Sequence, residues 1–118
     1  MTLILTPEVL RASYDFLNST IPFSRWNLPE GEDVRFKVVR SRSLCGYHDN
    51  GKPGKRKLVV AVSCIFIKTN AALVLTIAHE MCHVHQFRHF PRDPEHGPAF
   101  KRLADQVCKI HGFDRGLF

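Results

Sequence analysis

The residues best suited to chemistry lie in LTIAHEMCHVHQF, residues 75–87, which contain two histidines four positions apart. On an α-helix His79 and His83 lie on the same side, one turn apart, so their imidazole nitrogens can bind one Zn²⁺ at about 2.0–2.1 Å. Glu80 lies about 100° further round the helix, close enough for its carboxylate to take a proton from a water held by the metal. The three residues predict a hydrolytic zinc site with Glu80 as its base.

A catalytic zinc ion needs a third protein ligand and one open coordination position. Besides acidic residues, the chain offers several residues of suitable type: Cys45, His48, His85, His89, His96 and His111. We favour His96, because it follows the helix-breaking run PRDPEHGP (91–98), which lets the chain turn back toward the metal. The expected ligands of one catalytic zinc ion are therefore His79, His83 and His96.

A second histidine pair on the same predicted helix provides an internal comparison. His85 and His89 are also four positions apart, but Gln86 follows the first of them, so this pair lacks a base. We interpret both as solvent-facing or substrate-side residues. Cys82 lies three positions past His79 and faces away from the metal pair, so we expect it to be a small packing residue.

The sequence predicts which elements position these side chains. Thr6 and Pro7 open a first helix with an apolar stripe of Val9, Leu10, Tyr14, Phe16 and Leu17. Residues 21–33 form a loop held to the core by Phe23, Trp26 and Leu28. Period-two alternation predicts a strand over 34–38, and the apolar run 58–62 predicts a second strand. The segment DNGKPGKR (49–56) predicts a turn before that second strand, and residues 45–47 could form a third strand.

Two further helices complete the predicted domain. Asn70 caps a helix that continues to about Arg88, with an apolar face of Leu73, Val74, Ile77, Met81 and Val84. The last helix begins near Pro98, ends at Gly112 and buries Phe100, Leu103, Val107 and Ile110. We therefore predict one α+β domain over residues 1–118, with an N-terminal helix, a small three-stranded sheet, an active-site helix and a C-terminal helix.

Positive charge is concentrated in the middle of the chain. Residues 35–57 hold eight basic residues against Asp49 as their one acid, whereas the whole chain carries a net charge of +6. Such a patch indicates a polyanionic partner, most simply DNA, and the alternative is a solvated hairpin whose charges only aid solubility. The candidate nucleic-acid contacts are Arg35, Lys37, Arg40, Arg42, Lys52, Lys55, Arg56 and Lys57.

Composition and cysteine spacing indicate an intracellular protein. The four cysteines (Cys45, Cys64, Cys82 and Cys108) form no C-x-x-C pair, which argues against a structural zinc ribbon. The N-terminus has no basic segment before its short apolar run, and no stretch approaches the roughly 18 apolar residues of a membrane span. We expect a location in the cytoplasm or with the nucleoid, no membrane contact, and a monomer.

HEMCHVHQF followed by EHGPAFK resembles the SprT-like metalloprotease domain, which bacterial SprT proteins share with eukaryotic Spartan. The resemblance extends to the first helix, to Cys45-Gly46-Tyr47 and to the strand Val59–Ser63, and so covers roughly residues 7–110. It implies a zincin-like fold, zinc bound by His79, His83 and His96, and Glu80 as base. It also implies cleavage of proteins crosslinked to DNA, as in Spartan. Many SprT-like proteins continue into a zinc ribbon that this chain lacks, so we expect a minimal stand-alone form.

Three functions remain open from the sequence. The first is a zinc endopeptidase for DNA-associated proteins, in which a sheet edge near residues 58–63 aligns the substrate. The second is a zinc hydrolase of the peptide deformylase kind, with Cys45 as third ligand. The third is a basic DNA-binding module with a structural or vestigial zinc, which would need His85 or His89 in the fourth position. Candidates for partners that orient the ligand imidazoles are Asp93, Glu95 and Asp105.

Overall fold

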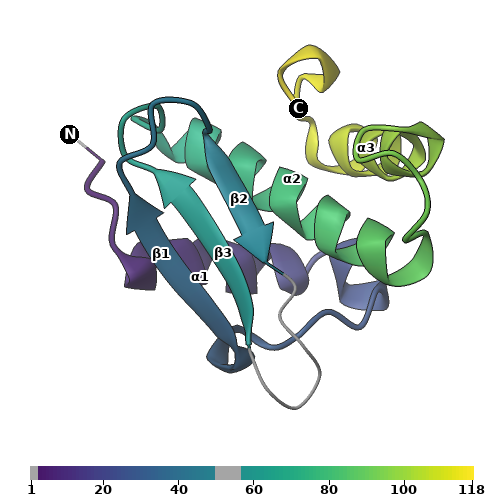
Figure 1. Cartoon of the computed structure of the whole chain (residues 1–118), viewed down its shortest axis with the longest axis horizontal. Coiled ribbons are helices and arrows are strands. Elements are labelled where there is room, and N and C mark those ends of the chain that lie inside the picture. Colours follow the sequence, from purple (N-terminus) through teal and green to yellow (C-terminus); the bar gives the residue numbers. More distant parts are fainter. Residues whose placement is uncertain (1–2, 50–56) are drawn as a thin grey trace.

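The computed structural model describes residues 3–49 and 57–118 and confirms the α+β class (Figure 1). Residues 50–56, which carry most of the predicted turn and the basic residues Lys52, Lys55 and Arg56, lie outside the described residues. The helices are α1 (Pro7–Asn18), α2 (Asn70–His89) and α3 (Pro98–His111), and the strands are β1 (Val34–Val39), β2 (Gly46–Asp49) and β3 (Leu58–Ser63). Short 3₁₀ turns cover Phe23–Arg25, Gly31–Asp33 and Arg115–Leu117.

The sheet is mixed, with strand order β1-β3-β2. β1 runs parallel to β3, with Val34 opposite Leu58, whereas β2 runs antiparallel to β3, with Gly46 opposite Val62. Two expectations were therefore wrong. The basic segment 35–57 is not one hairpin, because β1 pairs with β3 and not with its neighbour in sequence. Residues 58–63 also offer no free edge, because β3 is paired on both sides.

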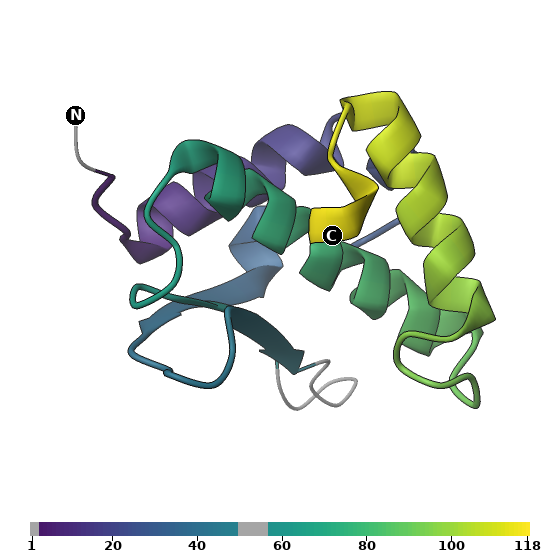
Figure 2. The same cartoon turned by 90° about the horizontal axis from the view of Figure 1, so that it is seen from above.

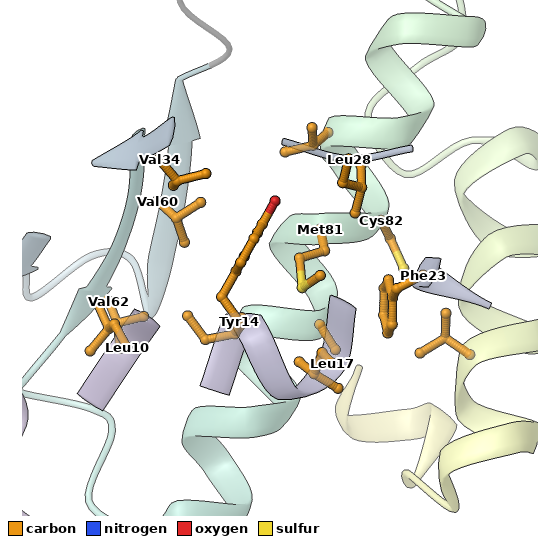
Figure 3. Packing of buried hydrophobic residues seen from close by; sticks show 14 of the residues in the cluster. Leu10, Tyr14, Leu17, Phe23, Leu28, Val34, Val60, Val62, Met81 and Cys82 are labelled. Atoms are coloured by element: carbon orange, nitrogen blue, oxygen red, sulfur yellow. The ribbon is translucent and has the colours of Figure 1, made fainter. Parts of the chain in front are cut away.

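Helix α2 forms the centre of the molecule. It packs against α1, β2, β3 and α3, so it lies between the sheet and the last helix (Figures 1 and 2). Tyr14 of α1 reaches between Val60 of the sheet and Met81 of α2, and Phe23 packs near Cys82 (Figure 3). Because α2 is buried on several sides, its polar side chains Glu80, His83 and Gln86 are buried as well.

The first helix begins as predicted and is tied to the loop that follows it. Thr6 Oγ1 accepts the N–H of Val9 at 3.2 Å, and the Tyr14 hydroxyl donates to the Pro29 carbonyl at 2.5 Å. Burial raises the pKa of that hydroxyl above its usual value. Phe16, expected in the core, is 58% exposed, because it lies about 120° round the helix from the stripe of Leu10, Tyr14 and Leu17. In the loop, Phe23 and Leu28 are buried and Trp26 is half-buried, as expected.

The two later helices also follow the predicted pattern, with local differences. The N-cap of α2 is Thr69, whose hydroxyl accepts the N–H of Ala72 at 3.1 Å, and not Asn70. Gly112 ends α3 in the left-handed conformation at φ 74°. Ile110, expected in the core, is 48% exposed, because the buried stripe of α3 runs through Phe100, Ala104, Val107 and Cys108.

The edge strand β2 approaches α2 unusually closely at Gly46. A Cβ atom at this position would lie 2.7 Å from the Ala61 carbonyl oxygen and 3.0 Å from Thr76 Cγ2. Only glycine allows β2 to pair with β3 while it lies against α2 at this point. Within residues 3–49 and 57–118, no helix combines the length and apolar character that a membrane crossing demands.

Candidate metal centre

Three imidazole rings converge on one point beside α2. The Nε2 atoms of His79 and His83 lie 3.1 Å apart, those of His83 and His96 3.2 Å, and those of His96 and His79 3.4 Å. Two nitrogens bound tetrahedrally to one zinc ion at about 2.0–2.1 Å are separated by about 3.3–3.4 Å. The spacing of the three atoms therefore fits one shared metal ion, and the structure brings together the three histidines that the sequence singled out.

The three histidines come from α2 and from the loop that leads to α3. His79 and His83 stand one turn apart on α2, and His96 precedes Gly97, the N-cap of α3. The residues between α2 and α3 turn the chain back, as PRDPEHGP predicted. Among the described residues, this is the one group of three or more suitable side chains close enough to share an ion.

Burial of His83 and partial burial of His79 favour the neutral form that metal binding requires. Burial lowers the pKa of His83 to about 4, against the opposing effect of its hydrogen bond to Gln86. Burial also lowers the pKa of His79, and nearby Glu80 partly offsets this. Both rings are therefore unprotonated near neutral pH, with nitrogen lone pairs available to a metal.

Gln86 orients one ligand and anchors the loop that carries another. Its Oε1 lies 2.9 Å from His83 Nδ1, and its Nε2 donates to the Pro94 carbonyl at 2.8 Å. Because an amide oxygen only accepts, Nδ1 carries the hydrogen and Nε2 of His83 faces the metal position. None of the acidic residues that we considered does this for His83, and Asp105 instead binds Arg115 at 2.7 Å. The sequence reasoning missed Gln86, although its spacing of three from His83 could have indicated it.

Aromatic side chains enclose the cluster. The Phe100 ring stacks on His83 at 4.2 Å between centroids, and the Phe118 ring lies 5.3 Å from His79. The segment after α3 returns across α2 (Figure 2) and so brings Phe118 beside His79. These contacts restrict ring rotation and lower the local polarity around the metal position.

Glu80 lies beside the cluster and has a partner on the sheet. Its Oε2 accepts a hydrogen bond from His48 Nδ1 at 2.8 Å. His48 belongs to β2, opposite Val60, so its ring faces α2. The sequence suggested His48 only as one of several possible third ligands, whereas the structure places it against Glu80.

The other residues considered as ligands lie elsewhere. His111 lies with its Nε2 3.0 Å from the Thr20 hydroxyl, and Cys45 is exposed before β2. Cys82 is buried, as expected of a packing residue. The described cluster therefore supplies neither the cysteine of a deformylase-like site nor the fourth ligand of a closed structural site.

The second histidine pair points to a different side of α2. The His85 ring is half-buried and stacks on Trp26 at 4.4 Å between centroids, while His89 is exposed. Both border an open hollow of about 430 Å³ that is lined by Arg25, Trp26, Asn27, His85, Arg88 and His89. Exposure of His89 agrees with the prediction, whereas His85 is partly covered by the loop.

The described basic residues are exposed. Arg35 and Lys37 alternate with core residues of β1, so they occupy the sheet face away from the core. Arg40 and Arg42 follow the strand and are exposed. Lys57 is exposed too, and its Nζ donates to the Glu32 carbonyl at 3.3 Å.

Comparison with known proteins gives one match. The model of the SprT-like family matches residues 10–115, nearly the whole chain. The searches of curated proteins and of solved structures returned no match.

Proposed function

The chain belongs to the SprT-like family, and from this we propose that it is a zinc-dependent endopeptidase that cleaves DNA-associated proteins, including proteins crosslinked to DNA. The family indicates a metallopeptidase-type domain. The observation that carries the proposal is the convergence of three Nε2 atoms within 3.4 Å of one another, with a buried glutamate beside two of them on the same helix.

His79, His83 and His96 would hold the metal ion. Three neutral imidazoles suit zinc, and a site with three protein ligands keeps one coordination position open. When bound, zinc supplies Lewis-acid polarisation of the scissile carbonyl and makes water more acidic.

Glu80 is the proton carrier in this proposal. Its carboxylate accepts a proton from the attacking water and later donates it to the nitrogen of the departing amine. Because Oε2 accepts the hydrogen bond of His48, we assign the proton transfer to Oε1. The ring of Phe100 is buried and that of Phe118 is half-buried, and both lie against His79. They limit the access of bulk water to the metal position.

Strand β2 is the element best suited to align an extended substrate. It lies at the edge of the sheet, packs against α2 and carries His48. A peptide that pairs with this edge would form main-chain hydrogen bonds along β2 and bring its scissile bond toward Glu80.

DNA association rests on charge. The described basic residues Arg35, Lys37, Arg40 and Arg42 are exposed, and the whole chain carries a net charge of +6. Arg35 and Lys37 share one sheet face, and exposed cations suit contacts with the phosphate backbone, which are independent of base sequence. They support a protease that is concentrated on DNA together with its protein substrates.

The test is cleavage of a DNA-binding protein substrate, with and without DNA, by wild type and Glu80→Gln at equal zinc content. We expect cleavage by wild type alone, accelerated by DNA. Equal cleavage with and without DNA would overturn the proposed role of DNA but would still support a protease. Two inert proteins that both hold zinc would overturn the protease and favour a DNA-binding module, and cleavage by Glu80→Gln would overturn the role of Glu80.

A further inference from the structure

The contact between His48 and Glu80 joins the sheet to the active-site helix through two buried side chains. His48 Nδ1 lies 2.8 Å from Glu80 Oε2, and the side chains are 9% and 8% exposed. A carboxylate accepts, so Nδ1 is the donor. The bond joins residues 32 positions apart, so it depends on how β2 and α2 pack against each other.

We propose that His48 is the positioning residue for Glu80, and that it sets the orientation of the carboxylate relative to a substrate aligned on β2. This inference rests on the proposed function, since it assigns the residue that orients the base of that reaction. His48 acts through Glu80 and not on the substrate.

Glu80 needs such a partner for two physical reasons. A buried carboxylate loses its hydration, and a hydrogen bond donated to it compensates for part of that loss. A glutamate side chain also has three rotatable bonds, and a bond to Oε2 restricts the plane of the carboxylate and hence the direction of Oε1. A misplacement of about 1 Å in a reacting group can cost about 100-fold in rate.

His48 is itself well fixed. Its ring lies nearly parallel to the His83 ring, with centroids 5.6 Å apart, and 5.4 Å from the Phe87 ring. Its main chain pairs opposite Val60 in the sheet. The donor is therefore held by the strand and by two rings of α2, so it can transmit the position of β2 to Glu80.

The alternative is that the His48 ring only fills space between β2 and α2. Three substitutions separate the two roles. His48→Phe keeps a ring and loses the donor. His48→Asn loses the ring but places an amide N–H close to the position of Nδ1, whereas the longer side chain of His48→Gln places it close to that of Nε2.

The experiment measures kcat, KM and bound zinc for wild type and the three variants, with His89→Asn as an exposed histidine control on α2. We expect His48→Phe to lower kcat about 100-fold with zinc content unchanged and KM changed much less. His48→Asn should recover most of kcat, and His48→Gln should recover less. If His48→Phe does not fold, the comparison of the Asn and Gln variants still decides between the two roles.

A second readout needs no activity. In the metal-free protein, the effects of His48→Phe and Glu80→Leu on the free energy of unfolding should be non-additive, because each substitution alone removes the one bond that the two residues share. Additive effects would overturn the proposal, as would a His48→Asn variant no better than His48→Phe. A wild type without proteolysis would instead overturn the proposed function, so the two failures are distinguishable.

Discussion

At the scale of single residues, the candidate metal centre is built from α2 and the loop that leads to α3. His79, Glu80 and His83 lie within one turn of α2, so their relative positions follow from the helix geometry alone. His96 could be predicted because the prolines before it require the chain to turn. His48 and Gln86 were not predicted as partners. The role of His48 depends on the packing of β2 against α2 and has no local signature in the sequence. The spacing of Gln86 from His83 was a local signal, but its bond to the Pro94 carbonyl was not.

Gln86 allows a prediction about metal affinity. We expect Gln86→Leu to weaken zinc binding about 10–100-fold, because His83 loses the acceptor that orients it and the loop of His96 loses an anchor. Competition with a chelator of known affinity measures this. Gln106→Leu, at an exposed position on α3, is the matched control, and an affinity equal to wild type in both variants would contradict the role of Gln86.

At the scale of elements, the boundaries of the helices followed from the sequence, and the pairing of the strands did not. Thr6, Pro7 and Gly112 mark helix ends through local backbone chemistry, and the structure uses all three. The parallel pairing of β1 with β3 is set by the tertiary arrangement, and neighbours in sequence gave no sign of it. Phe16 and Ile110 were expected in the core but are exposed. Both lie at the margin of a helical apolar stripe, where the pattern predicts burial less well.

Gly46 carries a prediction about the edge strand. Gly46→Ala should lower the free energy of unfolding by about 1–3 kcal/mol and reduce proteolysis, because the added methyl would collide with the Ala61 carbonyl and Thr76 and shift β2. Chemical denaturation and a cleavage assay measure both effects. Gly116→Ala is the control, since its methyl would meet only the movable end of Asp114. Equal stability of the two variants would refute the close-packing argument.

Tyr14 gives a pH-dependent prediction for the contact between α1 and the following loop. Burial raises the pKa of its hydroxyl, so above about pH 10 the unfolded chain ionises first and is favoured. Relative to Tyr14→Phe, wild type should be more stable by about 0.5–1.5 kcal/mol near pH 8, and the difference should shrink as the pH rises past 10. Chemical denaturation of both proteins from about pH 8 to above pH 10 measures how the stability difference changes with pH. A difference that does not depend on pH would contradict the raised pKa of Tyr14.

At the scale of the whole molecule, charge and fold class were predictable and the edge strands of the sheet were not. Net charge and fold class follow from composition and from the order of elements. The sheet edge expected near residues 58–63 was assigned to the wrong strand, because only the three-dimensional order β1-β3-β2 reveals that β2 is the edge strand beside α2. Arg35 and Lys37 share the sheet face away from the core because they lie two positions apart on β1.

The charged sheet face predicts a salt-dependent interaction with DNA. The double substitution Arg35→Glu and Lys37→Glu should weaken DNA binding and lower the salt slope by about one for each phosphate that the variant no longer neutralises. Binding titrations at several salt concentrations measure the slope. The matched control is Lys101→Glu with Arg102→Glu on α3, where both side chains are exposed. Equal reductions of affinity in the two double variants would indicate general charge attraction without a defined face.

The proposed function requires a zinc ion held by three histidines with one coordination position open. Zinc X-ray absorption spectroscopy of the zinc-loaded wild type tests it most directly. We predict three imidazole nitrogens at about 2.0–2.1 Å, one further light atom and no sulfur. A sulfur ligand at about 2.3 Å, or a shell of four imidazoles, would describe a closed structural site and contradict the catalytic centre.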